Sequence, residues 1–282
     1  PGKGKYSRAS IGVLQTVTSG TSGLCPFSLL IEKIMRQLMH EGDVYHTKFN
    51  GDIQIIRYSS KKDIDVKFLQ TGYIKTTDAT NIKRGTLKDP LYPRVYNRGF
   101  LGVGKHEASI NRKPTYKYNC WIAIFIRCYN EYALNKRPTY RGCEICKEWL
   151  NFQNFGDWFD ENYIEGWQLD KDIMHKGNKI YSPDNCCFVP DEINKLFIKS
   201  DHSRGKYPIG VTYHKTNNLF VARVTIEGKR KFIGNFDSID EAFNAYKVAK
   251  EKNIKDIAAK WKEKIPKRLY DAMMNYQVEF TD

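Results

Sequence analysis

The chain lacks any run of 18 apolar residues, so the sequence predicts no transmembrane helix and no membrane partner. It also lacks the cysteine pattern of a secreted disulfide scaffold, because its seven cysteines are an odd number spread through apolar segments. Both features indicate a soluble protein whose thiols stay reduced inside a cell.

Acidic residues are in short supply, with 32 Asp and Glu against 46 Lys and Arg in 282 residues, a net charge of +14. Residues 1–90 carry 14 basic and 8 acidic groups, residues 91–202 carry 16 and 14, and residues 203–282 carry 16 and 10. Two basic flanks around a nearly balanced centre favour a polyanionic partner such as double-stranded DNA. A basic protein without such a partner is the alternative.

Changes in hydrophobic period predict an α+β protein in several parts. Residues 1–42 comprise an extended arm and an amphipathic helix, Cys25–Met39. Residues 43–90 alternate apolar and polar positions, as in a small open β-barrel. Residues 91–202 form a central module with flanking helices, and residues 203–282 form a three-stranded sheet followed by helices.

Basic side chains recur on the expected strands of the N-terminal module, at Lys67, Lys75, Lys83 and Arg84. They make an auxiliary nucleic-acid contact one interpretation of this module. A purely structural barrel is the other.

Two amphipathic helices are expected in the central module. Trp121, Ile122, Phe125, Ile126 and Tyr129 are spaced as the apolar face of the first, and the second spans 148–159. The glycines of the preceding segment, Gly99-x-x-Gly102-x-Gly104, superficially resemble a phosphate loop. They lack the strand before, the helix directly after and a following Lys-Ser/Thr, so we expect an ordinary loop.

The most informative stretch is Leu169–Pro190. Alternation at Leu169–Ile173 predicts a strand, the Gly177-Asn178 turn a hairpin, and Ile180-Tyr181 the returning strand. Ser182-Pro183 then predicts a helix start through Cys187. This arrangement places Asp170 and Asp172 on one side, with the Asn185 amide facing them from the helix. A solvated turn with a surface ion pair is the plainer alternative.

This stretch resembles the HNH, or His-Me finger, endonucleases of phages and mobile introns, over roughly 92–197. The resemblance places Asp170 and Asn185 at the metal-binding positions, which implies Mg²⁺ or Mn²⁺ as cofactor. Lys171 stands where the family has its catalytic histidine. A lysine between two aspartates stays protonated and suits a phosphate contact, so His175, or more remotely His106, is the candidate general base.

Cysteine pairs suggest a different metal. Cys143-x-x-Cys146 and Cys186-Cys187 together could supply four zinc ligands. Adjacent cysteines rarely hold the same ion, and both pairs have apolar neighbours. We therefore expect small buried thiols and no zinc.

The C-terminal segment alternates again, with three strands at 210–214, 219–227 and 229–236 and a helix capped by Asp237-Ser238. Gly210-Val211, Ala222-Arg223-Val224, Phe232–Asp237 and Glu241–Tyr246 resemble the APETALA2-type DNA-binding domain. The resemblance implies a sheet face that enters the DNA major groove. Its contact positions are Thr212, His214, Arg223, Thr225, Arg230 and Phe232.

Taken together, these features predict a metal-dependent DNA endonuclease of the phage homing type. Its catalytic residues would be Asp170, Lys171, His175 and Asn185, and it would act in the cytoplasm of an infected bacterium. The competing hypothesis is a DNA-binding or scaffold protein that retains the fold without cleavage. A virion-associated protein whose basic arm contacts packaged DNA is a third.

Overall fold

A computed structural model describes residues 39–198, 206–280 and 282, and it confirms a mixed α+β protein. The chain divides into two compact units, Pro1–Leu87 and Lys88–Asp282. The expected N-terminal arm and nearly all of the amphipathic helix Cys25–Met39 lie outside the described residues. Within the described part, no helix is both long enough and apolar enough to cross a membrane.

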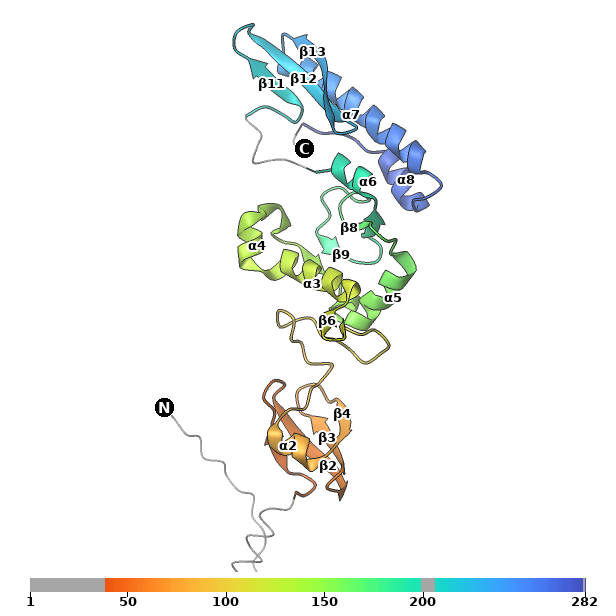
Figure 1. The fold of residues 1–282 in the computed structure, drawn as a ribbon. Helices are drawn as coiled ribbons and strands as arrows, with labels where there is room; N and C mark the ends of the chain where they lie inside the picture. Colours follow the sequence, from red (N-terminus) through yellow and green to blue (C-terminus); the bar gives the residue numbers. More distant parts are fainter. Residues whose placement is uncertain (1–38, 199–205, 281) are drawn as a thin grey trace, which may run out of the picture. The chain divides into compact units, whose positions relative to one another are not determined.

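The first unit is a four-stranded antiparallel meander (Figure 1). Its strands are β1 (Val44–His46), β2 (Asp52–Ser60), β3 (Asp63–Phe68) and β4 (Ile74–Thr77), hydrogen-bonded in that order. The inward positions of β2 and β3 carry five fully buried apolar side chains, Ile53, Ile55, Ile64, Val66 and Phe68. The alternation predicted from the sequence therefore corresponds to one buried sheet face.

Helix α2 (Ala79–Arg84) follows this sheet and packs Ile82 into the same core. The Asp78 carboxylate caps its start by accepting from the Asn81 N–H at 2.9 Å. Gly85 ends it in the left-handed conformation, with φ of 62°, which glycine adopts without steric cost. The basic residues Lys83 and Arg84 thus belong to a helix, not to a strand as expected.

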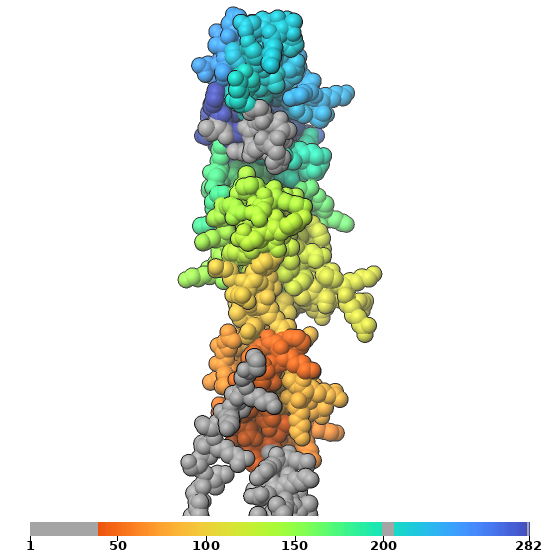
Figure 2. Space-filling model, turned by 90° about the vertical axis from the view of Figure 1, so that its left-hand side faces the viewer, coloured from red at the N-terminus to blue at the C-terminus, as the bar shows by residue number. Residues whose placement is uncertain are grey.

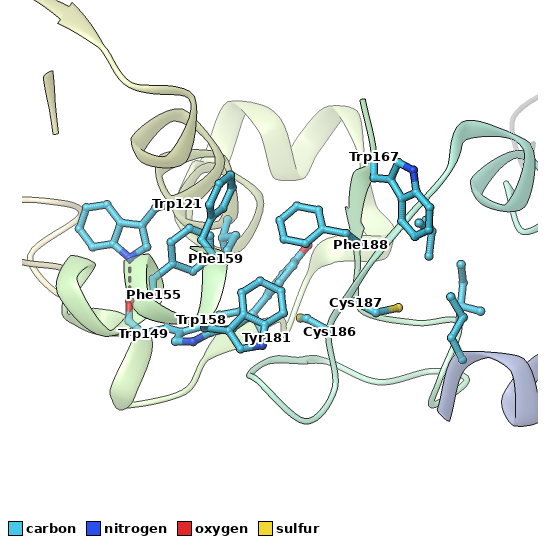
Figure 3. Packing of buried hydrophobic residues seen from close by; sticks show 14 of the residues in the cluster. Trp121, Trp149, Phe155, Trp158, Phe159, Trp167, Tyr181, Cys186, Cys187 and Phe188 are labelled. Carbon is cyan, nitrogen blue, oxygen red and sulfur yellow. Dashed lines mark hydrogen bonds between the residues drawn. The ribbon is translucent and has the colours of Figure 1, made fainter. Parts of the chain in front are cut away.

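The core of the second unit is built on two helices, α3 (Tyr116–Tyr129) and α5 (Phe152–Asn162). The buried face of α3 is Trp121, Ile124, Phe125 and Cys128; Ile126, expected on that face, is exposed. The Trp121 indole donates to the carbonyl of Trp149 at 2.7 Å, which fixes the loop before α5 (Figure 3). Short helical segments complete this region: α4 (Glu131–Lys136), η1 (Pro138–Tyr140) and η2 (Glu148–Leu150).

The glycine-rich segment before α3 is a loop, as predicted. A side chain at Gly99 would collide with the rings of Phe125 and Trp121. One at Gly102, where φ is 73°, would collide with Asn151, the N-cap of α5. These glycines therefore permit close packing of the loop on the helices. The short hairpin β5 (Ser109–Ile110) and β6 (Lys113–Pro114) connects this loop to α3.

The predicted hairpin of the central stretch is wrong in its pairing. Strand β8 (Gln168–Asp170) pairs with β10 (Cys187–Val189), with Asp170 opposite Cys187. Strand β9 (Ile180–Tyr181) pairs in parallel with β7 (Glu144–Ile145) instead. The reason is burial: all three β10 residues are buried, and their apolar side chains complete the core. Residues 182–185 therefore make a turn, and the helix α6 begins only at Asp191 and ends at Leu196.

The C-terminal strands are β11 (Val211–His214), β12 (Leu219–Ile226) and β13 (Lys229–Phe236), an antiparallel sheet as predicted. Helix α7 (Ile239–Trp261) begins at the Ser238 cap and covers one sheet face with Ala242, Phe243 and Tyr246. Its second half, with α8 (Lys267–Met274), packs in the central core. One helix thus belongs to both cores.

Candidate nucleic-acid interface and central hairpin

The register of the C-terminal sheet places the six predicted DNA contacts on one face. Cross-strand partners point to the same side of a sheet. Arg223 lies opposite Phe232 and Thr225 opposite Arg230, on the side away from the α7 core. Thr212 and His214 on β11 pair with Val221 and Leu219 of β12. These two residues alternate with the α7 side, as Arg223 and Thr225 do, so Thr212 and His214 lie on the same face. We call Thr212, His214, Arg223, Thr225, Arg230 and Phe232 the outer face.

The outer face is open and partly apolar. In the space-filling view the strand atoms, in cyan, lie in front of α7 and are not covered by it (Figure 2). Phe232 is 59% exposed although it is a large aromatic residue. The Arg223 guanidinium donates to the Thr212 hydroxyl at 3.1 Å, which orients the guanidinium along the sheet. An exposed aromatic between oriented cations is typical of a binding surface.

The C-terminal sheet region carries a strong excess of positive charge. Residues 206–236 hold six basic groups, Lys206, Lys215, Arg223, Lys229, Arg230 and Lys231, against one acidic group, Glu227. Within the described residues none of the six forms an ion pair. Glu227 and Gly228 form the β12–β13 turn with positive φ at both positions, which matches a type I′ hairpin. The turn therefore fixes the pairing that puts Arg230 opposite Thr225 on the outer face, whereas Lys229 and Lys231 pair with Ile226 and Val224 of the other face.

In the central hairpin, Asp170 is held at the end of β8. One carboxylate oxygen accepts from the N–H groups of Asp172 and Ile173, at 2.7 and 2.8 Å. Burial raises the pKa of Asp170 above its ordinary value, and these two backbone hydrogen bonds oppose the rise. The first oxygen is thus occupied by the turn, and the second is the one that could meet a ligand.

The β8–β10 pairing places Cys187 opposite Asp170, and Asn185 lies two residues before Cys187 in the chain. The Asn185 amide nitrogen makes a long contact with the Ile180 carbonyl, at 3.4 Å. Among the described residues, no three His, Cys, Asp or Glu side chains gather as a metal cluster. The side-chain oxygens of Asp170 and Asn185 are of the type that Mg²⁺ binds. Mg²⁺ is often held by only one or two side chains, with water and phosphate oxygens as its other ligands.

Lys171 does not occupy the position expected of a phosphate contact. The residue is only 5% exposed, and its ammonium donates to the Asp172 carboxylate and, at 2.8 Å, to the Asn178 carbonyl. It also lies 5.8 and 5.9 Å from the ring centres of Tyr140 and Tyr181. The side chain is turned inward because these groups satisfy its charge. Asp172 is likewise engaged, because one of its carboxylate oxygens accepts from the Lys171 ammonium.

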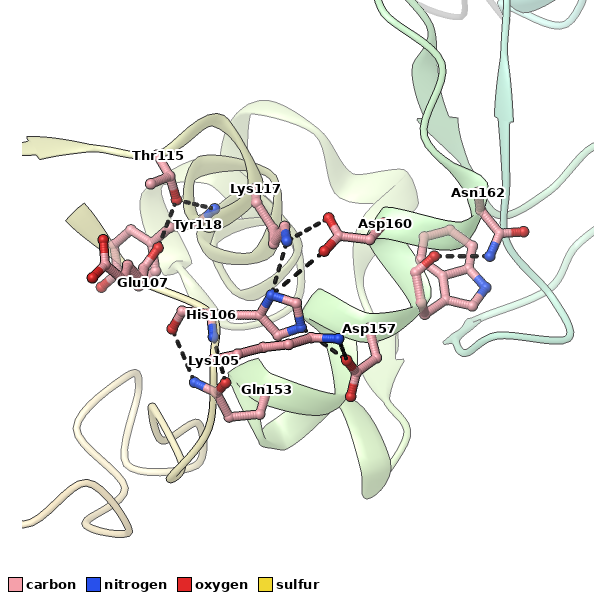
Figure 4. Close-up of polar contacts among 11 residues, drawn as sticks. Lys105, His106, Glu107, Thr115, Lys117, Tyr118, Gln153, Asp157, Asp160 and Asn162 are labelled. Carbon is pink, nitrogen blue, oxygen red and sulfur yellow. Dashed lines mark hydrogen bonds and ion pairs between the residues drawn. The ribbon is translucent and has the colours of Figure 1, made fainter. Parts of the chain in front are cut away.

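Of the candidate bases, His175 is exposed and His106 is buried. The His106 ring lies between α3 and α5, with Nε2 3.0 Å from Asp157 Oδ1 and Nδ1 2.9 Å from Lys117 Nζ (Figure 4). A lysine ammonium can only donate, so Nδ1 accepts and Nε2–H donates to Asp157. Both ring nitrogens are therefore occupied, and His106 is structural in this arrangement. Hydrogen bonds from Lys105 and then from His106 hold the pKa of Asp157 below its ordinary range.

The cysteines proposed as alternative zinc ligands lie in the core. Cys143, Cys186 and Cys187 are buried and Cys146 is half-buried. Burial raises the pKa of Cys187 to about 12 and that of Cys146 to about 11. These neutral thiols pack as small apolar groups, as the sequence predicted.

Sequence reasoning missed Arg127, which projects from α3 toward the hairpin. Burial would lower the pKa of Arg127, but Tyr181, Tyr140 and Asp170 raise it above its ordinary value. It also missed Arg268 of α8, which donates to the carbonyls of Pro183 and Cys186 at 3.2 and 3.0 Å. Both contacts are long-range in sequence, and no local pattern identifies them. The turn bearing Asn185 is therefore supported from α8.

Comparisons with protein-family models, with curated proteins and with solved structures find no match to this chain.

Proposed function

We propose that this protein binds double-stranded DNA through the outer face of its C-terminal sheet. The observation that carries the proposal is the cross-strand alignment of Arg223 with Phe232 and of Thr225 with Arg230 on a face that α7 leaves uncovered. Arg223 and Arg230, which form no ion pair with any described residue, match a phosphate backbone in charge.

The width of the sheet supports the same partner. Neighbouring strands lie about 4.8 Å apart, so three strands span roughly 10 Å between the outer backbones. The major groove of B-DNA is about 12 Å wide and admits a narrow β-ribbon. Arginines there can donate to guanine edges, and an exposed aromatic such as Phe232 can contact a thymine methyl group.

Binding to duplex DNA at increasing salt tests the proposal. We expect the logarithm of the binding constant to fall linearly with the logarithm of salt, by about 0.9 for each phosphate contacted. Arg230→Ala should weaken binding by about 1–3 kcal/mol if its side chain meets a base edge. Lys231→Ala is the matched control, because it removes the same charge from the neighbouring position on the same strand. Equal effects of the two changes would contradict readout by Arg230.

A second candidate function is cleavage of the bound DNA at the central hairpin. Its support is the β8–β10 register, in which Asp170 lies opposite Cys187, two residues after Asn185 in the chain. Asp170 and Asn185 would hold the Mg²⁺ ion, which supplies charge stabilisation at a phosphate. The exposed His175 is the candidate for proton transfer. Lys171 has no part in this proposal because it is buried.

Supercoiled plasmid distinguishes this candidate from a DNA-binding protein without cleavage. Nicking with Mg²⁺ or Mn²⁺ that stops in EDTA and in the Asp170→Ala variant would support the nuclease. Asp184→Ala is the control, since Asp184 is an exposed carboxylate of the neighbouring turn. Plasmid that stays intact at saturating binding would favour the DNA-binding or scaffold role, of which a virion-associated protein is one form.

A further inference from the structure

The first unit contains a basic hollow of about 670 Å³ beside helix α2. Tyr58 and two pairs of cations contribute to its lining: Lys61 with Lys62, and Lys83 with Arg84. Lys61 and Lys62 of the turn between β2 and β3 line one side, and residues of α2 line the other. The two sides are joined by a hydrogen bond from the Ala79 N–H to the Lys61 carbonyl, at 2.9 Å.

Local structure explains why the cations gather there. Ser60 pairs with Asp63, so Lys61 and Lys62 form a two-residue turn and both are exposed. Lys83 and Arg84 occupy the last turn of α2, where the partial negative charge of the helix end favours cations. The hollow therefore faces solvent with four basic groups on rigid elements.

Nearby carboxylates are already engaged. The Arg57 guanidinium binds Asp63 and Asp65, at 2.8 and 2.6 Å, and holds the pKa of both below the ordinary range. Asp78 also lines the hollow, but its two oxygens accept from the Asn81 backbone and side chain. Within the described part of the chain, no carboxylate forms an ion pair with Lys61, Lys62, Lys83 or Arg84. Four cations against one capping carboxylate leave a positive surplus at this place.

The charge of the hollow indicates its occupant. Four of its lining residues are cations, which favours an anionic occupant. We propose that the hollow binds backbone phosphates of double-stranded DNA, a contact without sequence preference. This inference rests on the proposed function.

A phosphate contact in the hollow has a measurable consequence. Each phosphate held in the hollow should add about 0.9 to the slope of binding against salt. Base sequence should affect the outer face and leave the contribution of the hollow unchanged.

The experiment compares two triple variants of the full chain. Lys61→Gln/Lys62→Gln/Lys83→Gln removes three charges from the hollow. The control, Lys113→Gln/Lys136→Gln/Lys147→Gln, removes three exposed charges from the second unit, at positions that line no part of the hollow and have no assigned DNA contact. Thermal unfolding checks both proteins, and the single variant Lys62→Gln replaces the triple if its folding is impaired.

We expect the salt slope for duplex binding to fall by about one to three in the hollow variant, relative to the control variant. Equal slopes would overturn the inference and leave binding by the outer face intact. A hollow variant that loses affinity while Arg223→Ala and Arg230→Ala bind normally would overturn the outer face alone. Absence of duplex binding by the unaltered chain would overturn both.

Discussion

The Nη1 of Arg223 donates to the Thr212 hydroxyl across strands β11 and β12, at 3.1 Å. Arg223 stands on the central strand of the C-terminal sheet, directly opposite Phe232 on β13. The hydroxyl therefore orients the guanidinium at the middle of the outer face. A guanidinium held in one orientation loses less conformational entropy when it binds a ligand.

This orientation can be tested with Thr212→Val, which keeps a β-branched side chain and removes the hydroxyl. We expect duplex affinity to fall by about 0.5–1.5 kcal/mol, because Arg223 must then be ordered on binding. Thermal unfolding should change little, since Thr212 is exposed. Thr76→Val, which alters an exposed strand threonine in the first unit, is the comparison. Unchanged affinity of Thr212→Val would contradict the positioning role.

Substitution of Phe232 should affect DNA affinity and folding stability by different amounts. The side chain is 59% exposed, so Phe232→Ala should change the free energy of unfolding by no more than about 0.5 kcal/mol. If the ring is buried against DNA, affinity should fall by about 1–2 kcal/mol through lost apolar contact. Val248→Ala, an exposed apolar residue of α7, should leave affinity unchanged. Titration calorimetry and chemical unfolding measure the two effects.

Lys171 should behave as a structural residue. Lys171→Met leaves the Asn178 carbonyl without its donor, and we expect a loss of about 1–3 kcal/mol in unfolding free energy. The salt slope for DNA binding should stay as in the unaltered chain, because the ammonium does not face solvent. Lys147→Met removes an exposed cation and should leave stability nearly unchanged. A lower salt slope with unchanged stability would restore Lys171 as a phosphate contact.

The buried thiols should make the folding stability of the protein fall at high pH. Burial raises the pKa of Cys187 and of Cys128 to about 12, whereas an unfolded thiol titrates near 8.5. The contribution of the neutral thiols is fully present below about pH 8.5 and is lost as pH rises toward 12. The urea midpoint should therefore fall as pH rises above about 9. Cys187 and Cys128 should resist a thiol reagent at pH 8 until urea is added; rapid reaction of the folded chain would contradict their burial.

The sequence by itself determined the elements whose signals are local. Period-two alternation identified the three C-terminal strands, and the Ser238 cap marked the start of α7. The parity of a strand also determined that Arg223 and Thr225 share a face, because side chains alternate every residue. Position along a strand suffices for that pair alone. The other four contact positions came from the resemblance, and on β13 the register shift puts Arg230 and Phe232 on the opposite face from Gly234 and Phe236.

Only the tertiary structure decided which strands pair in the stretch Leu169–Pro190. The sequence placed Ile180-Tyr181 as the partner of 169–173, whereas burial of Cys187–Val189 pairs β10 with β8 and sends β9 to β7. The same packing turned Lys171 inward to Asn178, where a local pattern of charges had suggested an exposed residue. Pairing and side-chain direction depend on which apolar segment fills the core, and the residues that settle it lie far apart in the chain.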